Sequence, residues 1–331
     1  MAARILPPST EAIAEAAALL RAGQLVGMPT ETVYGLAADA SSADAVARIF
    51  AAKGRPNDHP VIVHVAAGAD LSRWAARIPE AARRLMAGFW PGPLTLILPR
   101  APGVLDAVTG RQDTVGLRCP SHPVAQALLS AFGGGLAAPS ANRFGRVSPT
   151  TAQHVAEEFD QTVPLVLDGG PCAVGIESTI VDVSTELPIL LRPGHVSAAA
   201  LSAVLGSPVL TPAQMETRRE VPRVSGALSA HYAPRTALRL ADPDVLAAEV
   251  AAARGQGATV GVWSAREPAG ATVWLPAPSE PEAYAQALYA TLRELDGQGL
   301  DMLLLESPPA TPAWAAIRDR LGRACVGSGT R

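Results

Sequence analysis

Lysine is nearly absent from this sequence. Of the 27 cationic side chains, 26 are arginines, and the one lysine is Lys53. Cysteine is scarce as well. Cys119, Cys172 and Cys325 are odd in number and show no C-x-x-C spacing, which argues against a disulfide framework or a zinc ribbon and favours a reducing compartment. No apolar run approaches the roughly 18 residues that cross a bilayer, and the N-terminal segment reads as an amphipathic helix rather than a signal peptide. These absences predict a soluble, cytoplasmic protein.

Charge and length narrow the class further. The 331 residues carry a formal net charge of −3, which offers no broad attraction to a nucleic-acid backbone, although a local basic patch stays open. The chain has 48% hydrophobic and 17% charged residues, a composition typical of folded globular proteins. At roughly 100–200 residues per domain, its length predicts two domains.

Hydrophobic periodicity predicts a catalytic α/β domain over residues 1–205. Apolar strands alternate with helices there, and adjacent strands at 179–183 and 189–191 indicate a mixed sheet. Residues 206–235 contain four prolines and no apolar periodicity, so they are expected to link two domains. Residues 236–331 again alternate strands and helices and predict a smaller, parallel, Rossmann-like sheet.

The individual elements follow from the same patterns. Helices are predicted at 11–21, 43–53, 79–89, 123–132, 151–159, 198–205, 245–254, 282–295 and 313–323. Strands are predicted at 25–28, 61–65, 94–98, 136–138, 165–167, 179–183, 189–191, 237–240, 259–263, 272–275 and 302–305.

Common nucleotide-binding and hydrolase motifs are missing. No G-x-x-x-x-G-K-[ST] occurs, and the glycines at 255 and 257 follow a helix and lack the third glycine of a dinucleotide fingerprint. Ser140 lacks the flanking glycines of a nucleophile elbow. The six histidines show no tight metal-ligand spacing. The sequence therefore disfavours a P-loop, a standard NAD site, a serine hydrolase and a zinc enzyme.

What remains is a set of polar clusters next to the predicted strands. They lie at residues 29–35 (PTETVYG), 53–58 (KGRPND), 113–118 (DTVGLR), 139–142 (PSAN) with 146–148 (RVS), 175–179 (GIEST) and 191–194 (LRPG). Ligands of open α/β sheets bind at strand ends, and loops with hydroxyls, backbone N–H groups and cations suit phosphates and carboxylates. The residues predict a site for an anionic small molecule.

These clusters carry a resemblance. PTETVYGL, KGRPNDHPVIVHV, WPGPLTLIL, TVGLRCPSHP, APSAN, GIESTIVDV and LLRPG, in this order across about residues 20–195, resemble the YrdC/Sua5 family of L-threonylcarbamoyladenylate synthases. The linker ending in His231-Tyr232-Ala233-Pro234 and the second domain look like the longer, Sua5-type architecture. The resemblance implies a YrdC-like twisted mixed sheet with flanking helices and a smaller Rossmann-like C-terminal domain.

The resemblance also implies an activity. In this family ATP, L-threonine and bicarbonate or CO2 give threonylcarbamoyl-AMP and pyrophosphate, and other proteins then transfer the threonylcarbamoyl group to adenosine 37 of tRNAs that read ANN codons. The chain is thus expected to be a nucleotidyltransferase whose partners are ATP, L-threonine, bicarbonate and the downstream tRNA-modifying machinery, with at most a weak contact to tRNA itself. Mg²⁺ is expected to bridge the ATP phosphates with few direct protein ligands.

Site residues carry over position by position. The K-x-R and S-x-N signatures imply phosphate contacts and a catalytic role for Lys53, Arg55, Ser140 and Asn142. The resemblance further implies nucleotide contacts for Thr114, Ser148 and Arg192, and threonine contacts for Thr30, His64, Arg118 and Ser178. These residue types suit the chemistry, because negative charge accumulates as a carbamate attacks the α-phosphorus, and cations and orientation matter more than an acid–base pair.

Ordinary structural roles stay open at several of these positions. Lys53 could favour a helix C-terminus, His64 could be a satisfied core histidine, and Thr30 could cap a turn. Glu177 is either a residue that orients its neighbours or a metal ligand. Cys119, beside Arg118, is expected to be a buried structural cysteine rather than an activated thiol.

Two other function classes stay open. A YrdC-like domain could serve as a module for double-stranded RNA or tRNA, which steeply salt-dependent binding would reveal. A relative that acts on carbamoyl phosphate and ATP is the other, although acylphosphatase and zinc-finger segments are missing. The sequence also departs from the family at Ala38, where glycine is common, and at residues 227–230, where the usual lysine and tyrosine are absent; the second departure puts side-chain contacts from the linker to ATP in doubt.

Overall fold

A computed structural model describes residues 3–214 and 221–329, and its tertiary contacts divide the chain into two units. The first unit holds the chain as far as Phe144 together with Pro149–Ala173 and Glu177–Ala227. The second holds Gly145–Ser148, Val174–Ile176 and the chain from Leu228 onward. The expected linker is thus divided between the units at Ala227, and its charged run at 218–220 lies outside the described residues.

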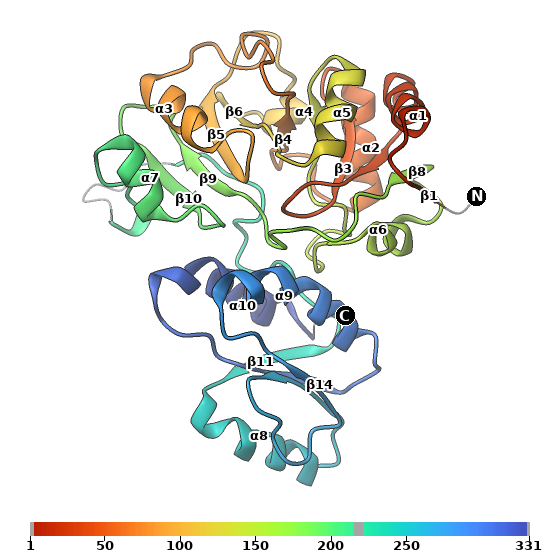
Figure 1. Ribbon diagram of the computed structural model, residues 1–331, viewed down its shortest axis with the longest axis vertical. Helices are drawn as coiled ribbons and strands as arrows, with labels where there is room; N and C mark the ends of the chain where they lie inside the picture. Colours follow the sequence, from red (N-terminus) through yellow and green to blue (C-terminus); the bar gives the residue numbers. More distant parts are fainter. Residues whose placement is uncertain (1–2, 215–220, 330–331) are drawn as a thin grey trace. The chain divides into compact units, whose positions relative to one another are not determined.

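The first unit is built on one mixed sheet of ten strands within the described residues (Figure 1). From edge to edge the strands are β1 (Arg4–Leu6), β8 (Leu165–Leu167), β2 (Val26–Met28), β3 (Gly35–Asp39), β7 (Leu136–Ala137), β4 (Ile62–His64), β6 (Thr114–Arg118), β5 (Leu94–Pro99), β9 (Thr179–Asp182) and β10 (Ile189–Arg192). Parallel pairs (β4 with β6, β5 with β9) alternate with antiparallel ones (β7 with β4, β6 with β5). The expectation of a mixed α/β sheet is confirmed.

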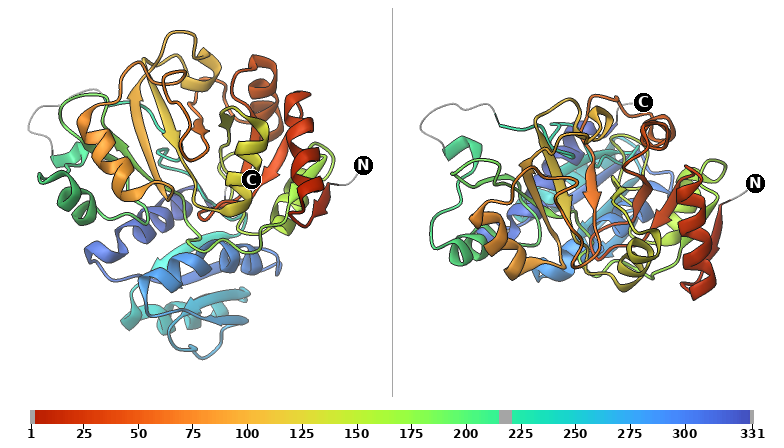
Figure 2. Two further views of the ribbon diagram at one scale, coloured as in Figure 1. Left: turned by 45° about the horizontal axis from the view of Figure 1, so that its top comes forward. Right: turned by 90° about the horizontal axis from the view of Figure 1, so that it is seen from above.

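Helices pack against this sheet, and some of them lie side by side. They are α1 (Thr10–Arg21), α2 (Ala43–Lys53), α3 (Glu80–Phe89), α4 (Asp106–Thr109), α5 (Pro123–Phe132), α6 (Ala152–Phe159) and α7 (Ala198–Leu205), followed by a short 3-10 turn at Pro212–Gln214. Helix α1 lies beside α5, and α3 lies beside α7, in both Figure 1 and Figure 2. The predicted helices of this domain are confirmed to within a few residues.

The ends of α2 show why the sequence folds this way near the second polar cluster. The Ser42 hydroxyl accepts a hydrogen bond from the Ala45 N–H at 3.2 Å, which satisfies one of the free donors of the first turn. Gly54 then adopts a left-handed conformation with φ of 62° and ends the helix. Lys53 is therefore the last helical residue, and the chain turns sharply between it and Arg55.

The second unit contains a parallel four-stranded sheet. Its strands, in spatial order, are β11 (Ala237–Ala241), β14 (Met302–Glu306), β12 (Val260–Ser264) and β13 (Val273–Pro276). Helix α8 (Pro243–Gly255) covers one face, while α9 (Pro281–Asp296) and α10 (Ala315–Gly327), preceded by a 3-10 turn at Pro312–Trp314, lie on the other (Figure 1). The predicted parallel sheet is confirmed.

The sequence patterns missed parts of the first sheet. Residues 113–118 were expected to be a polar cluster near a strand end, but Thr114–Arg118 is itself the central strand β6. Residues 35–39, after the first cluster, form β3, and Arg4–Leu6 forms the edge strand β1. In the described part of the chain no helix is long and apolar enough to span a membrane.

Candidate active site

The central strands of the first unit carry polar side chains on one face of the sheet. The register places His64 of β4 opposite Arg118 of β6, and Arg118 opposite Thr95 of β5. Residues directly opposite one another project to the same side of a sheet. Three polar residues from three strands therefore form a row across this face, and all three are buried.

The other face of the same strands is apolar. Val63, Leu117 and Leu96 alternate with the polar row along β4, β6 and β5, and all belong to the main hydrophobic core. Because successive side chains of a strand point to opposite faces, each strand contributes one side to the core and the other to the site. The site thus extends across a face of the sheet, whereas the sequence suggested the strand ends alone.

The loop between β2 and β3 supplies the next part of the site. Thr30 shapes it: its hydroxyl donates to the Val33 carbonyl at 2.6 Å and accepts from the N–H groups of Thr32 and Val33 at 3.2 and 3.3 Å. This turn presents two neighbouring side chains to Arg118. The Thr32 hydroxyl accepts from Arg118 Nη1 at 2.8 Å, and Glu31 Oε1 lies 2.8 Å from Arg118 Nη2. The Thr30 hydroxyl is thereby engaged within its own turn, and Thr32 is the residue that meets Arg118.

His64 is a neutral group in this site. Burial, with the nearby Arg118 charge as a second cause, lowers the pKa of His64 to about 3. Its Nδ1 atom is buried and has no hydrogen-bond partner within residues 3–214 and 221–329. A buried polar nitrogen that lacks a partner is costly, so Nδ1 is a candidate for a ligand contact. The backbone of Ile62 and Leu136 also interacts with the ring, and the roles of a ligand-binding and of a core histidine both stay predictions.

A chain of hydrogen bonds continues from Thr95 toward the cations. The Thr95 and Ser178 hydroxyls are 2.8 Å apart, and Arg192 Nη2 donates to the Ser178 carbonyl at 2.9 Å and to its hydroxyl at 3.2 Å. Arg192 Nη1 in turn donates to the Ser225 carbonyl at 2.8 Å, and the Ser225 hydroxyl accepts from Arg55 at 3.4 Å. The two sets of residues expected to bind threonine and nucleotide are thus joined in one network.

Lys53 stabilises the loop that follows β7 through hydrogen bonds to its backbone. Its Nζ atom donates to the carbonyls of Ser140 and Asn142, at 2.5 Å each. Burial lowers the pKa of Lys53 well below its usual value, the adjacent Arg55 lowers it further, and the charges of Glu158 and Glu177 partly offset this. An ammonium group has three donors, so these two carbonyls leave a third. An anionic ligand beside Lys53 and Arg55 would stabilise both charges.

Two of the polar clusters meet through their backbones. The Pro139 carbonyl accepts from the Leu36 N–H, and the Tyr34 carbonyl accepts from the Ala141 N–H, at 2.8 Å each. The loops at 29–34 and 139–142 are therefore held side by side. Asn142 is buried and its amide donates to the Arg143 carbonyl at 2.7 Å.

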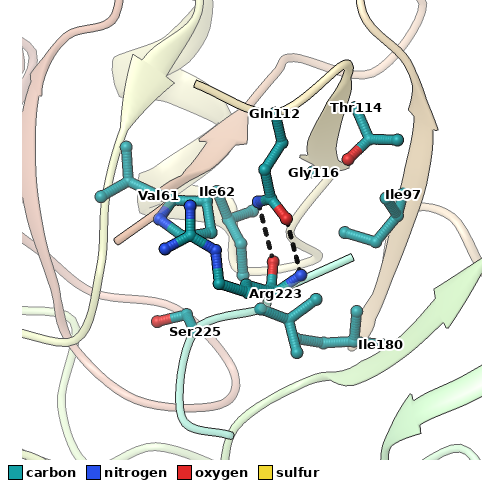
Figure 3. A pocket seen from close by; sticks show the side chains of 11 residues that line it. Val61, Ile62, Ile97, Gln112, Thr114, Gly116, Ile180, Arg223 and Ser225 are labelled. Carbon is teal, nitrogen blue, oxygen red and sulfur yellow. Dashed lines mark hydrogen bonds between the residues drawn. The ribbon is translucent and has the colours of Figure 1, made fainter. Parts of the chain in front are cut away.

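A pocket opens on the same face of the sheet (Figure 3). Its floor is the register row of Ile62, Gly116 and Ile97, two residues along from the row of His64, Arg118 and Thr95. A Cβ atom at Gly116 would lie 3.2 Å from Ile97 and 3.5 Å from Ile62. A larger residue at this position would therefore fill part of the pocket. Thr114 lies beyond it, at the start of β6, and lines the pocket.

Residues of the expected linker form another wall of this pocket. Gln112 and Arg223 exchange two hydrogen bonds, from the Arg223 N–H to Gln112 Oε1 at 2.7 Å and from Gln112 Nε2 to the Arg223 carbonyl at 3.1 Å (Figure 3). Arg223 also donates to the Gly110 carbonyl at 2.9 Å. Val224 and Ser225 therefore lie against the pocket, and this stretch of the chain is part of the site.

The structure brings ten of the eleven expected site residues together in the first unit. The exception is Ser148, whose segment Gly145–Ser148 packs in the second unit, where Arg293 donates to its carbonyl at 3.3 Å. The structure adds Glu31, Thr32, Thr95 and Ser225, which were not singled out from the sequence. The first two stand in the PTETVYG cluster and Thr95 stands in the WPGPLTLIL motif, whereas Ser225 lies in none of the motifs.

The structure also shows the surroundings of Glu177 and Cys119. Glu177 is buried, and its charge acts on Lys53, which fits a residue that orients the cations. Cys119 is buried, and burial raises the pKa of its thiol. The expectation of a structural rather than an activated cysteine is confirmed.

A buried face rich in cations and hydroxyls, on an α/β sheet, defines the first unit as an enzyme domain for anionic small molecules. Comparison with known proteins agrees. Residues 18–194 match the Sua5/YciO/YrdC family, described as "Telomere recombination", and residues 196–326 match the "Threonylcarbamoyl-AMP synthase, C-terminal domain". The chain belongs to the Sua5/YciO/YrdC family.

Individual relatives extend over nearly the whole chain. The threonylcarbamoyl-AMP synthase of Bacillus subtilis is 41% identical over 95% of this chain and 93% of its own length. That of Pyrococcus abyssi is 38% identical over 93% of this chain and 92% of its own. The structure of P. abyssi Sua5 complexed with L-threonine has a TM-score of 0.88 at 37% identity, and the match covers 95% of this chain and 94% of that one.

Proposed function

We propose that this protein is a threonylcarbamoyl-AMP synthase that converts L-threonine, bicarbonate or CO2 and ATP to threonylcarbamoyl-AMP and pyrophosphate. The observation that carries the proposal is that Arg118, held by Thr32, lies opposite Thr95 in the strand register, and that a chain of hydrogen bonds runs from Thr95 through Ser178 and Arg192 to Ser225 and Arg55. It joins a carboxylate-binding fork to phosphate-binding cations on one face of a sheet. Relatives of 41% and 38% identity carry this name.

The chemistry needs cations more than it needs an acid or a base. The threonine amine adds to the carbon of CO2 and loses a proton, or adds to the carbon of bicarbonate with loss of water, and gives a carbamate. A carbamate oxygen then attacks the α-phosphorus of ATP, the bond between that phosphorus and the bridging oxygen breaks, and pyrophosphate leaves with the electron pair. Negative charge on the phosphoryl group and the leaving group is stabilised by fixed cations. Lys53, Arg55 and Arg192 are buried side chains suited to that task.

We assign the two substrates to two parts of the network. Arg118, with His64, Ser178 and the Thr30 turn, would hold threonine, because a guanidinium binds a carboxylate through two parallel hydrogen bonds. Lys53, Arg55, Ser140, Asn142, Thr114 and Arg192 would hold ATP. For Ser148, whose segment packs in the second unit, a nucleotide contact stays a prediction from the resemblance. The pocket over Gly116, with its apolar floor and the Thr114 hydroxyl, suits a nucleoside.

Mg²⁺ would accompany the ATP. In the described stretches no three His, Cys, Asp or Glu side chains gather as a metal site, so we place the ion on phosphate oxygens and water, as is common for this metal. It would neutralise phosphate charge there, while Lys53 and Arg55 orient the triphosphate.

The product would serve tRNA modification. We propose that other proteins transfer its threonylcarbamoyl group to adenosine 37 of tRNAs that read ANN codons, and that this takes place in the cytoplasm, where ATP and tRNA are available. Among residues 3–214 and 221–329 the cysteines form no disulfide. A weak direct contact with tRNA stays a prediction, which binding measurements at several salt concentrations would test.

Pyrophosphate release tests the activity. The purified protein with ATP, Mg²⁺, bicarbonate and L-threonine is expected to release pyrophosphate only when both threonine and bicarbonate are present. Release that ignores threonine would overturn the proposal. Release with carbamoyl phosphate in place of threonine and bicarbonate would instead support the carbamoyl-phosphate relative.

A further inference from the structure

Glu31 and Arg118 form a buried ion pair at the centre of the polar face. Glu31 Oε1 lies 2.8 Å from Arg118 Nη2, and both side chains are more than nine-tenths buried. Removing two charges from water costs several kcal/mol per ion and is compensated only when geometry and hydrogen bonding are good. Stability alone therefore does not explain why this ion pair is buried.

The hydrogen bonding of this pair is incomplete. The backbone N–H groups of Glu31 and Ser121 lie close enough to the Glu31 carboxylate to lower its pKa, but neither Glu31 oxygen, nor Arg118 Nη2, makes a well-aligned hydrogen bond in residues 3–214 and 221–329, despite the short contact between them. Buried charged atoms in native proteins are almost always satisfied by protein, water or ligand. One donor group and one carboxylate, side by side, are thus open to a ligand.

Several contacts of Arg118 and of the loop do not involve the Glu31 side chain. Arg118 is already fixed by Thr32, which accepts from Nη1, and by the Gly92 carbonyl, which accepts from Nε at 3.4 Å. The loop is shaped by the Thr30 hydroxyl. The Glu31 carboxylate pairs with the remaining nitrogen of Arg118, Nη2, and is not among the groups that fix Nε and Nη1.

The groups near this pair are uncharged. Burial raises the pKa of Cys119, and raises that of Cys172 to about 12, so both thiols are neutral. His64 is neutral as well, because its pKa is about 3. Burial is the largest single influence on the pKa of Glu31 and would raise it, but the charge and hydrogen bond of Arg118, together with the backbone N–H groups of Glu31 and Ser121, bring the pKa below its usual value. At neutral pH the pair is one fixed cation beside one fixed anion.

A free α-amino acid matches this charge pattern. It carries a carboxylate and an ammonium group on one carbon and has no net charge, so it can meet both members of the pair without leaving an uncompensated charge. A lone arginine would suit a hydroxy acid equally well. We propose that Glu31 binds the α-ammonium group of the amino acid whose carboxylate binds Arg118, and so selects an amino acid over the corresponding hydroxy acid. This inference rests on the proposed function, since it places threonine at Arg118.

A comparison of two ligands separates binding of the ammonium from support of Arg118. The ligands are L-threonine and its analogue with a hydroxyl in place of the amino group, titrated calorimetrically with a saturating non-hydrolysable ATP analogue present. The wild type is expected to prefer threonine by roughly tenfold to hundredfold, the usual value of a hydrogen bond to a charged group. Glu31→Gln is expected to lose this preference through weaker threonine binding, with the analogue affected less than about threefold.

Thr32→Val is the matched control, because Thr32 contacts Arg118 without bearing a charge. It should weaken both ligands equally and keep the preference. If Glu31→Gln also weakens both equally, Glu31 only supports Arg118 and the inference is wrong. If Glu31→Gln does not fold, Glu31→Asp replaces it: the preference should fall severalfold with the analogue's affinity unchanged, and an equal loss for both ligands would again contradict the inference. A wild type that binds ATP but neither ligand would refute the proposed function itself.

Discussion

On β6, neighbouring residues have opposite surroundings. Leu117 points into the main hydrophobic core, while Arg118, the next residue, lies on the face that carries His64 and Thr95. The same alternation separates Val115 from Thr114 and Gly116. One short strand therefore contributes to a core on one side and to a binding site on the other.

The two faces of the sheet are expected to contribute differently to stability and to binding. The apolar face gains from burial, at roughly 25 cal/mol per Å², and tolerates no loss of volume. The polar face buries charges whose pairing with one another offers little net stability. Substitutions of adjacent residues should therefore separate folding from binding.

The sharpest separation is expected between Arg118→Lys and Leu117→Ala. Lysine keeps the charge beside Glu31 but lacks the planar fork, so KM for threonine should rise roughly tenfold to hundredfold with little change in stability. Leu117→Ala leaves a cavity and should lower the free energy of unfolding by about 2–5 kcal/mol with an unchanged KM. Steady-state kinetics and urea unfolding measure both, and similar effects of the two variants would show that the faces are not distinct.

Lys53 holds a loop in place and is also proposed to bind ATP, so a substitution there should affect both stability and binding. Lys53→Gln removes an ammonium that two backbone carbonyls share, so we expect a loss of about 1–3 kcal/mol in stability and roughly a tenfold rise in KM for ATP. Arg48→Gln, on the exposed side of the same helix, loses a hydrogen bond to the Gly23 carbonyl but no contact with the site, so it is the control for binding and should leave the KM for ATP unchanged. A normal KM for ATP in Lys53→Gln would assign the lysine to the loop alone.

The smallest effect concerns pH and His64. Its pKa is about 3 in the folded protein and 6.5 ordinarily, so the unfolded state binds more protons between these values, and acid favours unfolding. Stability should fall below pH 6.5 by up to about 1.4 kcal/mol per pH unit. Urea unfolding at pH 7, 6 and 5 should show a weaker dependence in His64→Gln than in the wild type, and parallel curves would mean that His64 does not titrate in this way.

Much of the fold could be predicted from local signals. Helix α2 is marked by its apolar spacing, by Ser42 at its start and by Gly54 at its end, and the second unit alternates helices and strands regularly. Strand β6 was missed because Thr114, Gly116 and Arg118 on its site face interrupt the apolar run. The polar alternation that hid the strand is what makes it part of the site.

The site could be predicted as residues but not as a network. Motif positions predicted Lys53, Arg55 and Arg118 one by one as candidate site residues. The pairing of His64, Arg118 and Thr95 depends on strand register, and Ser225 reaches Arg192 from 33 residues along the chain. Contacts between residues so far apart in the chain cannot be predicted from local sequence patterns. The sequence also did not predict that the segment around Ser148 packs in the second unit.

The central claim is that one face of the first sheet binds both substrates. A crystal structure of the protein with L-threonine and a non-hydrolysable ATP analogue tests it most directly. We expect the threonine carboxylate on Arg118, the triphosphate beside Lys53 and Arg55, and the nucleoside over Gly116. Ligands bound elsewhere, with Arg118 still contacting only Glu31, Thr32 and Gly92, would contradict it.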